Sequence, residues 1–394
     1  MSRSVVVVSG ARTAVGDFGG SLSGLSPCDL AAAVAREAIA RAGLEPKDMQ
    51  QTVFGHVIHT APEDMYISRV AAMRAGVPET APALTLNRLC GSGLQAVVTA
   101  AEQILLGNAD VALAGGAENM SRAGHLLTQS RNGQKMGDVT ATDMMVGALT
   151  DPFGNGHMGI TAENVAARGG IDRAAQDALA LTSHRRAAKA IAEGRFREQI
   201  LPVTVKKGRG ETVFDTDEHV RPDVTAEDLA GLRAAFRKDG TVTAGNASGI
   251  NDGAAALVLM EAETARARGI APLARIVAYG LGGVAPDVMG LGPVPAVRQA
   301  LARAGLTIAD MDVIESNEAF AAQACAVAAE LGFPPEKTNP NGGAVALGHP
   351  IGASGAIILV KLLYELRRSG GRYGLATMCI GGGQGIAVIV DASA

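Results

Sequence analysis

Tryptophan is absent from this 394-residue sequence, aromatic residues make up only 3%, and there are only four cysteines. The cysteines, at positions 28, 90, 325 and 379, form no Cys-x-x-Cys pair, and no His-x-x-x-His pattern completes a zinc site. Scattered cysteines of this kind are typical of free thiols in a reducing compartment. We therefore expect neither a disulfide framework nor a metal site.

Long apolar runs and a large excess of one charge are also missing. No apolar run reaches the length needed to span a membrane, and the first residues lack the apolar core of a signal peptide. The net charge of −4 gives no sign of nucleic-acid binding. The last residues are not a peroxisomal address. These absences predict a cytoplasmic protein without a membrane or nucleic-acid partner.

The composition that is present favours an α/β fold. Hydrophobic residues make up 47% and charged residues 19%, and 50 glycines allow elements to pack closely. Short apolar runs alternate with segments in which apolar residues recur with the period of a helix. They predict strands near 5–8, 52–55 and 110–114 and helices over 27–42 and 65–75. This alternation predicts a mostly parallel sheet that is covered by helices.

An internal repeat divides the chain. The segment from Arg36 to Leu44 reappears from Arg298 to Leu306, 262 positions later, and the same offset places Gly93 on Gly355. We predict a first half, an inserted loop domain and a second half, which comprise residues 1–120 with 247–270, residues 121–246 and residues 271–394 respectively.

Cys90 lies in a glycine-flanked turn before a predicted helix. Residues 87–93 read Asn-Arg-Leu-Cys-Gly-Ser-Gly, and apolar residues then recur with a helical period. A helix N-terminus offers free backbone N–H groups and a positive dipole end, so we expect Cys90 to favour the thiolate, which is the working nucleophile. The alternative is a small buried apolar residue in a tight turn.

The repeat supplies Cys90 with partners. Its offset maps the Cys90 loop onto residues 349–352, His-Pro-Ile-Gly, and maps two strand ends of the first half near Asn317 and Cys379. Ligands bind outside strand ends in open α/β sheets, so the loops of two packed halves should face one crevice. Taken singly, His349 and Cys379 are also compatible with core positions, and Asn317 with the cap of a helix starting at Glu318.

The insert is locally basic between Arg185 and Arg237, and a turn-rich loop follows at residues 245–253. One interpretation is a solvated helix face over a predicted helix at residues 173–193. The other is a lid that binds an anionic ligand through side chains, because no Gly-x-x-x-x-Gly-Lys phosphate loop is present.

Four segments together resemble one family. They are the Cys90 turn, Asn317-Glu-Ala-Phe, residues 342–355 around Gly-His349-Pro, and Met378-Cys-Ile-Gly-Gly-Gly. In family order, and over essentially the whole chain, they closely resemble the thiolases, which include acetyl-CoA acetyltransferases and 3-ketoacyl-CoA thiolases. The resemblance implies an α/β fold of duplicated αβαβα halves with an inserted loop (lid) domain. It also implies CoA and acyl-CoA as substrates, no further cofactor, and a homotetramer in which part of the insert joins dimers.

By this resemblance the protein is an acetyl-CoA C-acetyltransferase, or β-ketothiolase, which reversibly joins two acyl-CoA molecules into a 3-ketoacyl-CoA and CoA. Cys90 takes the first acyl group as a thioester, His349 activates Cys90, and Cys379 deprotonates the second acyl group. Asn317, through a water, acts with His349 on one carbonyl, and the backbone N–H groups of Cys90 and Gly381 polarise the other.

The acyl and CoA contacts follow from the same resemblance. The residues expected to line the pantetheine and acyl channel are His157, Met158, Ser248, Met289, Ala319 and Phe320. Arg221 is expected to bind the CoA 3′-phosphate, with an exposed structural arginine as the alternative. The segment from Asp64 to Arg69 is similar to β-ketothiolases of polyhydroxyalkanoate synthesis, which predicts tolerance for chains longer than acetoacetyl-CoA. A degradative 3-ketoacyl-CoA thiolase of fatty acid metabolism, with a broader chain-length range, is the alternative.

Overall fold

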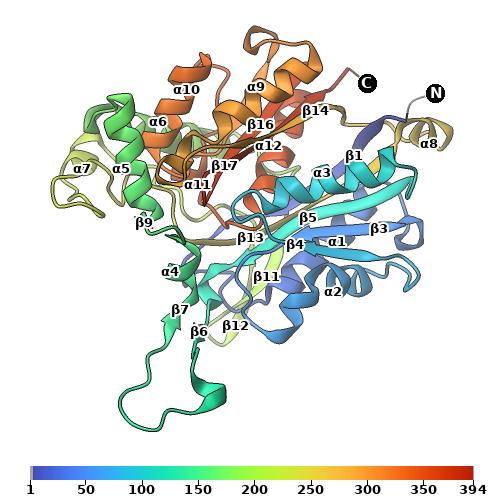
Figure 1. Cartoon of the computed structure of the whole chain (residues 1–394). Coiled ribbons are helices and arrows are strands. Elements are labelled where there is room, and N and C mark those ends of the chain that lie inside the picture. Colours follow the sequence, from blue (N-terminus) through green and yellow to red (C-terminus); the bar gives the residue numbers. More distant parts are fainter. Residues whose placement is uncertain (1–2, 394) are drawn as a thin grey trace.

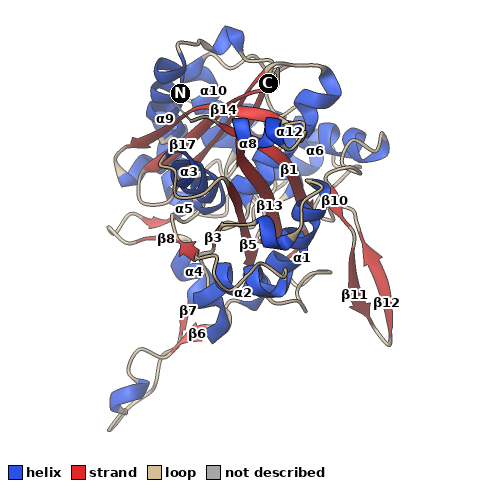
Figure 2. Ribbon diagram, turned by 90° about the vertical axis from the view of Figure 1, so that its right-hand side faces the viewer, coloured by secondary structure: helices blue, strands red, loops and turns tan. Residues whose placement is uncertain are grey.

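The computed structural model describes residues 3–393, which form one large sheet with helices on both faces (Figures 1 and 2). Along the sheet the strand order is β15-β16-β17-β14-β1-β13-β5-β3-β4. The first half contributes β1 (Val5–Thr13), β3 (Gln51–Gly55), β4 (Ala83–Leu86), β5 (Val111–Asn119) and β13 (Asn251–Glu261). The second half contributes β14 (Ala274–Gly283), β15 (Val313–Ser316), β16 (Tyr373–Ile380) and β17 (Gln384–Asp391). Two short strands, β2 (Gly16–Asp17) and β10 (Ile200–Leu201), pair with β13 and β1.

The prediction of a mostly parallel sheet was wrong. Between the strands of residues 3–393, parallel pairing joins β3 with β4 and β5, β15 with β16, and β1 with the short β10. Strand β13 returns from the insert and pairs antiparallel with both β1 and β5, while β16 and β17 form an antiparallel hairpin. The halves join where β1 and β14 run antiparallel, with Val6 opposite Arg275. The alternation of strands and helices in the first 120 residues could not reveal the direction of these later strands. Both a hairpin and a long connection allow two strands to pair antiparallel.

The two halves of this sheet pack against opposite sides of two central helices, so three helix layers alternate with two strand layers, as the resemblance implies. The outer helices are α1 (Pro27–Arg41) and α2 (Ile67–Arg74) on the first half, and α9 (Pro293–Ala304) and α10 (Ala321–Leu331) on the second. Between the halves lie α3 (Ser92–Leu105) and α12 (Ser354–Ser369). On β5, Val111 and Leu113 face α1, whereas Ala112 and Ala114 face α3. Both faces of the strand are therefore covered, which explains its continuous apolar run.

The internal repeat is also a repeat in structure. Helices α3 and α12 begin at Ser92 and Ser354, again 262 positions apart. Their backbones touch where they cross, because a Cβ on Gly93 would lie 2.7 Å from the Ala356 backbone nitrogen. A Cβ on Gly355 would lie 2.3 Å from the backbone nitrogen of Leu94. This glycine-dependent crossing brings the loops before the two helices together.

The insert covers one end of these layers and also sends out an arm. Its helices are α4 (Met144–Ala148), α5 (Met158–Gly169), α6 (Arg173–Ala192) and α7 (Ala226–Ala230). Strands β6 (His125–Leu126) and β7 (Thr142–Asp143) form the stem of the arm, which projects from the body in Figure 1. A second hairpin of β11 (Val203–Lys207) and β12 (Gly210–Phe214) projects in Figure 2. The remaining elements are β8 (Thr150–Asp151), β9 (Gly156–His157), α8 (Ala262–Ala267) and α11 (Ala344–Leu347).

Across residues 3–393, none of the helices combines the length and the apolar character that crossing a membrane requires. The expected cytoplasmic location stays a prediction.

Candidate active site

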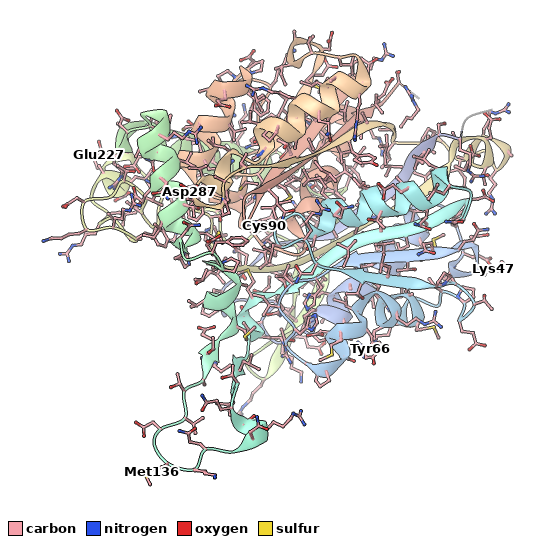
Figure 3. The ribbon with its side chains drawn as sticks, viewed as in Figure 1. Lys47, Tyr66, Cys90, Met136, Glu227 and Asp287 are labelled. Atoms are coloured by element: carbon pink, nitrogen blue, oxygen red, sulfur yellow. The ribbon has the colours of Figure 1, made fainter. Side chains whose placement is uncertain are left out.

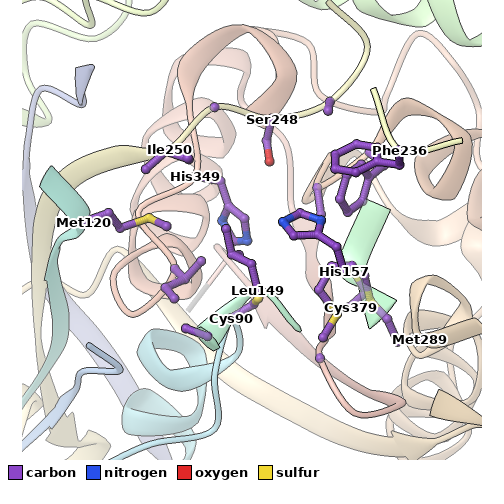
Figure 4. A pocket seen from close by; sticks show the side chains of 18 of the residues that line it. Cys90, Met120, Leu149, His157, Phe236, Ser248, Ile250, Met289, His349 and Cys379 are labelled. Atoms are coloured by element: carbon purple, nitrogen blue, oxygen red, sulfur yellow. The ribbon is translucent and has the colours of Figure 1, made fainter. Parts of the chain in front are cut away.

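A cavity of about 390 Å³ lies where the loops before α3 and α12 meet the insert (Figure 4). Of the residues predicted from the sequence, its lining includes Cys90, His157, Met158, Ser248, Met289, Ala319, Phe320, His349, Cys379 and Gly381. Asn317 and Arg221 do not line it. The other walls are mainly apolar, and an apolar cavity with a few converging polar groups is the usual form of a small-molecule site.

Cys90 is presented by a strained turn. Leu89, just before it, has φ of 47°, in the left-handed region that costs a residue with a Cβ about 1–3 kcal/mol. Side chains hold this turn: the Leu89 N–H donates to Asn87 Oδ1 at 2.8 Å, and the Ser92 hydroxyl donates to the Leu89 carbonyl at 2.6 Å. The same hydroxyl accepts from the Arg88 N–H at 2.8 Å. The strain thus lies beside the predicted nucleophile, at the edge of the cavity.

The surroundings of Cys90 do not favour the thiolate that was expected from the sequence. Although Cys90 is only partly buried, desolvation at the cavity wall raises its pKa to about 11, because an ionised sulfur there would lose hydration. The backbone N–H groups of Gly381 and of Cys90 itself lower that pKa, but they do not offset the burial, and the Glu118 carboxylate raises it further. Helix α3 begins only at Ser92, so Cys90 precedes the first helical turn. Cys90 is therefore a thiol at rest and needs a base.

His349 has the tautomer of a base. Its Nδ1 lies 2.6 Å from Ser354 Oγ, and the Ser354 hydroxyl donates to the Pro350 carbonyl at 2.9 Å. Since that hydroxyl has one hydrogen, its oxygen accepts from Nδ1–H, and the lone pair of His349 is on Nε2. Within residues 3–393, no group forms a hydrogen bond with Nε2 of His349. Burial lowers the pKa of His349 to about 4, so the ring is neutral at neutral pH.

Cys379 and Gly381 come from the hairpin of the second half. Cys379 is near the end of β16, and the turn to β17 contains Gly382 and Gly383 with φ of 81° and 87°. This left-handed turn, which glycine adopts without strain, places the Gly381 N–H against the Cys90 sulfur. Burial raises the pKa of Cys379 well above its usual range, and ionisation of Cys90 would raise it further. Cys379 is therefore also a thiol at rest, close to Cys90.

Asn317 lies behind the main cavity. Its side chain is buried, and within residues 3–393 its Nδ2 has no hydrogen-bond partner. It borders a small space of about 20 Å³ that it shares with Gly348 and Ser354. That volume accommodates one water, but none of the residues around it lines the main cavity, so the water-mediated role stays a prediction. Helix α10 begins at Ala321 with Phe320 as its N-cap, so the interpretation of Asn317 as the cap was wrong.

The opposite wall of the cavity is aromatic. His157 N-caps α5 through its Nδ1, which accepts from the Gly159 N–H at 3.1 Å. Its ring stacks on Phe236 at 4.9 Å, and Phe236 meets Phe320 edge to face at 6.2 Å. The Ser248 N–H donates to the Ala319 carbonyl at 3.0 Å, which joins the loop after the insert to the second half. These contacts form an aromatic, partly polar wall on that side of the cavity.

Arg221 lies on the surface outside this wall. Its side chain is exposed, and its backbone N–H donates to His184 Nδ1 at 3.2 Å. Two residues earlier, His219 packs against the Ser248 loop, because a Cβ on Gly249 would lie 2.5 Å from its ring. Arg221 is thus close in sequence to the cavity wall without forming part of it.

None of the residues from Asp64 to Arg69 lines the cavity. Met65 and Tyr66 are 60% and 66% exposed. Residues at these positions cannot set the size of the acyl space by direct contact.

Several lining or supporting residues were missed from the sequence. Ser354, which fixes the His349 tautomer, lies inside the Gly-His-Pro-x-x-x-Ser segment and was available as a signal. Phe236, Met120, Leu149, Ile250 and Ile351 also line the cavity. Phe236 and Leu149 belong to the insert, which has no counterpart in the repeat, so no offset could place them.

Comparisons with known proteins agree with this geometry. The thiolase N-terminal domain family matches residues 5–263, and the thiolase C-terminal domain family matches residues 270–392. Beta-ketothiolase BktB of Cupriavidus necator is 61% identical over 392 residues, which cover 99% of this chain and all of the relative. An acetyl-CoA acetyltransferase of Chromobacterium violaceum is 52% identical over 98% of this chain and 99% of its own length.

Solved structures give the same result. Human mitochondrial 3-ketoacyl-CoA thiolase superposes with a TM-score of 0.97 at 43% identity, and an acetyl-CoA acetyltransferase of Bacillus anthracis with 0.97 at 47%. In both, 99% of each chain is covered. The chain belongs to the thiolase family.

Proposed function

We propose that the protein is an acetyl-CoA C-acetyltransferase, a β-ketothiolase that condenses two acyl-CoA molecules through a Cys90 acyl-enzyme. The observation that carries this proposal is the meeting of two thiols and one neutral imidazole at a single apolar cavity. A Claisen condensation needs an acyl carrier, a base for an α-carbon and donors for two oxyanions, and these groups supply them.

The first half-reaction transfers an acyl group to Cys90. His349 Nε2 takes the Cys90 proton as the sulfur attacks the thioester carbonyl, and the bond to the CoA sulfur breaks. The N–H groups of Cys90 and Gly381 stabilise the oxyanion. Because Cys379 rests as a thiol, it gives its proton to the departing CoA thiolate and is left as a thiolate. The acyl-enzyme thus forms together with the base that the next step requires.

The second half-reaction forms the carbon–carbon bond. The Cys379 thiolate takes a proton from the α-carbon of the second acyl-CoA, whose enolate oxygen is stabilised by His349 and by a water on Asn317. The carbanion attacks the Cys90 thioester, and the Cys90 sulfur leaves and regains its proton from His349. Each proton and bond change is assigned to a side chain or a substrate, so the proposal requires no metal or further cofactor.

The test is the location of the acyl group. The enzyme is incubated with isotopically labelled acetyl-CoA, quenched in acid and digested, and the peptides are analysed by mass spectrometry. The label is expected on the peptide that contains Cys90 and is expected to be missing in Cys90→Ser. An acetyl group on Cys379, or no protein-bound acetyl, contradicts the proposal.

A degradative 3-ketoacyl-CoA thiolase of broader chain length is the second candidate. It is favoured by the apolar space beside Cys90, which Met120, Leu149 and Ile351 line. Thiolysis rates for 3-ketoacyl-CoAs of increasing length separate the two. A steep fall beyond the shortest substrates supports the acetyltransferase, and a flat profile supports the degradative enzyme.

The proposed active form is a homotetramer. The arm between β6 and β7 exposes Leu126, Leu127, Met136 and Val139, with Met136 89% exposed near its tip (Figure 3). Apolar side chains on a projecting arm need a partner surface, and an identical arm of a second copy supplies one. Replacing the arm with a short Gly-Ser turn is expected to halve the mass measured by light scattering. An unchanged mass contradicts this role.

A further inference from the structure

The Glu118 carboxylate is buried at the end of β5 and has no role in the steps above. Its oxygens accept from the backbone N–H groups of Val57 and Ile58, each at 3.1 Å, and from that of Gly352 at 2.9 Å. His56 Nδ1 lies 3.2 Å from Glu118 Oε1. Glu118 and His56 are both fully buried. A carboxylate this deep in the protein is costly unless donors surround it, as they do here.

The hydrogen-bond donors around Glu118 favour its ionised form, whereas burial raises the pKa of this carboxyl group. Three backbone donors and the His56 ring face its two oxygens, so the O–H of a protonated acid would point at a donor. His56 Nδ1 also lies 2.8 Å from the Ala117 carbonyl, and since both neighbours are acceptors, Nδ1 bears a hydrogen. The Nδ1–H of His56 thus donates to the Ala117 carbonyl, and the ring lies beside the carboxylate on the side of the first half.

Gly352 joins this carboxylate to the other half. It ends the loop that begins at His349, and a Cβ on it would lie 2.5 Å from Glu118 Oε2. A Cβ on Gly116 would lie 2.2 Å from the Gly352 carbonyl oxygen. The His349 loop is thus packed directly on the strand ends of the first half, with Glu118 as the acceptor for its last N–H.

The same negative charge acts on Cys90. Glu118 raises the pKa of that thiol, although burial is the larger cause. Other titratable groups near the pair are Asp64, whose Oδ2 is 3.9 Å from His56 Nε2, and His59, whose ring stacks on His56 at 5.3 Å. Cys28 contacts Asp64 at 3.4 Å on the far side.

We propose that Glu118 is a positioning residue that holds the His349 loop of the second half against the strand ends of the first half. The expected effect on turnover rests on the proposed function, whereas alkylation of Cys90 does not. The two assays therefore have separate readouts.

The experiment compares Glu118→Gln with the wild-type enzyme in two assays. In the first, iodoacetamide alkylates Cys90 over a pH series, and the rate is followed on the Cys90 peptide by mass analysis. In the second, kcat and KM are measured for condensation. Glutamine removes the charge and turns an amide toward the Gly352 N–H. We expect kcat to fall about 10²-fold with little change in KM, while Cys90 is still alkylated over the pH series much as in the wild type.

Normal alkylation of Cys90 in an enzyme with a lower kcat and an unchanged KM is a combination that simple loss of structure does not produce. The matched control is Glu365→Gln, a buried carboxylate on α12 that accepts from Asn341 at 2.8 Å. It should leave kcat in place. A wild-type kcat in Glu118→Gln, or the same fall of kcat in both variants, overturns the proposal.

Glu118→Asp covers the case in which the glutamine variant does not fold. It keeps the carboxylate but withdraws it from Gly352, so kcat should fall with little change in KM. Wild-type kcat in this variant overturns the proposal. If the wild-type enzyme itself catalyses no condensation, the proposed function fails instead, so the two failures are distinguishable.

Discussion

The two halves of the molecule share one scaffold but deliver different chemistry at equivalent places. The turn before α3 presents Cys90, whereas the equivalent position before α12 is Gly352, and the functional group there, His349, lies three residues earlier. A sulfur nucleophile needs a strained turn that exposes it, while an imidazole base needs a side chain long enough to reach that sulfur. The comparison teaches that duplication supplied two loops facing one cavity, and that neither half contains a complete site.

The halves also differ in their buried charges. Beside the second-half loop, Lys361 pairs with Glu315 at 2.8 Å, and both side chains are buried. The first half has Glu118 with His56 at the corresponding end of its strands. The apolar layers repeat, but the charged groups do not, so the asymmetry of the site lies in its polar residues.

The largest expected effect comes from removing the group that only the first half supplies. Cys90→Ser keeps the shape of the turn but replaces the thiol with a much weaker nucleophile. We expect condensation to fall by at least about 10⁴-fold, because residues that act as one catalytic unit fail together. Steady-state assays with acetyl-CoA measure this, and circular dichroism checks the fold. Activity within tenfold of the wild type would remove Cys90 from the mechanism.

The matching change in the second half is His349→Gln, which removes the base. A positioned base contributes about 10²–10⁴-fold, so acylation of Cys90 should slow by that factor. The variant also has a pH signature. The pKa of His349 is lowered to about 4 in the fold, so below pH 6.5 the unfolded chain binds a proton that the folded chain does not.

Stability of the wild type should therefore fall as the pH drops from 6.5 towards 4, by about 2 kcal/mol at pH 5 from this group. Urea unfolding at pH 7 and pH 5 compares the wild type with His349→Gln. The variant should lose less stability between the two pH values. An equal loss in both proteins contradicts the buried neutral imidazole.

A smaller effect is expected at Ser354, which supports the histidine without touching substrate. Ser354→Ala removes the acceptor for Nδ1–H, so the neutral ring can adopt the other tautomer. We expect kcat to fall about tenfold to a hundredfold with little change in KM. Ser354→Thr, which keeps the hydroxyl, should restore most of the rate. Equal defects in both variants would indicate a packing role.

The smallest effect is expected outside the halves, at Arg221 in the insert. Arg221→Ala should raise KM for acetyl-CoA severalfold at nearly constant kcat, because a phosphate contact binds ground state and transition state alike. An acyl-pantetheine thioester without the nucleotide should be unaffected. Arg185→Ala, another basic side chain of the insert, is the control. Equal losses with both substrates would mean that Arg221 is structural.

The sequence predicted those residues of the site that the internal repeat places at equivalent loops of the two halves. The offset of 262 placed His349 and Cys379 beside Cys90, and the structure brings all three to one cavity. Strand direction was not predictable, because β13 returns from an insert that has no repeat. The charge state of Cys90 was also missed, since it depends on burial by both halves, which a helix-start argument does not include. Roles of the individual residues stay predictions.

The central claim is that the two thiols divide the work, with Cys90 holding the acyl group and Cys379 moving the α-proton. It is tested most directly by the exchange of acetyl-CoA α-protons with D₂O in Cys379→Ser. Serine preserves the volume but has a far higher pKa, and CoA thiolate can leave without an acid, so Cys90 should still become acetylated. The account predicts acetylated protein whose exchange rate is reduced about 10²–10⁴-fold from that of the wild type. Exchange at a near wild-type rate in this variant would contradict it and assign the base to another group.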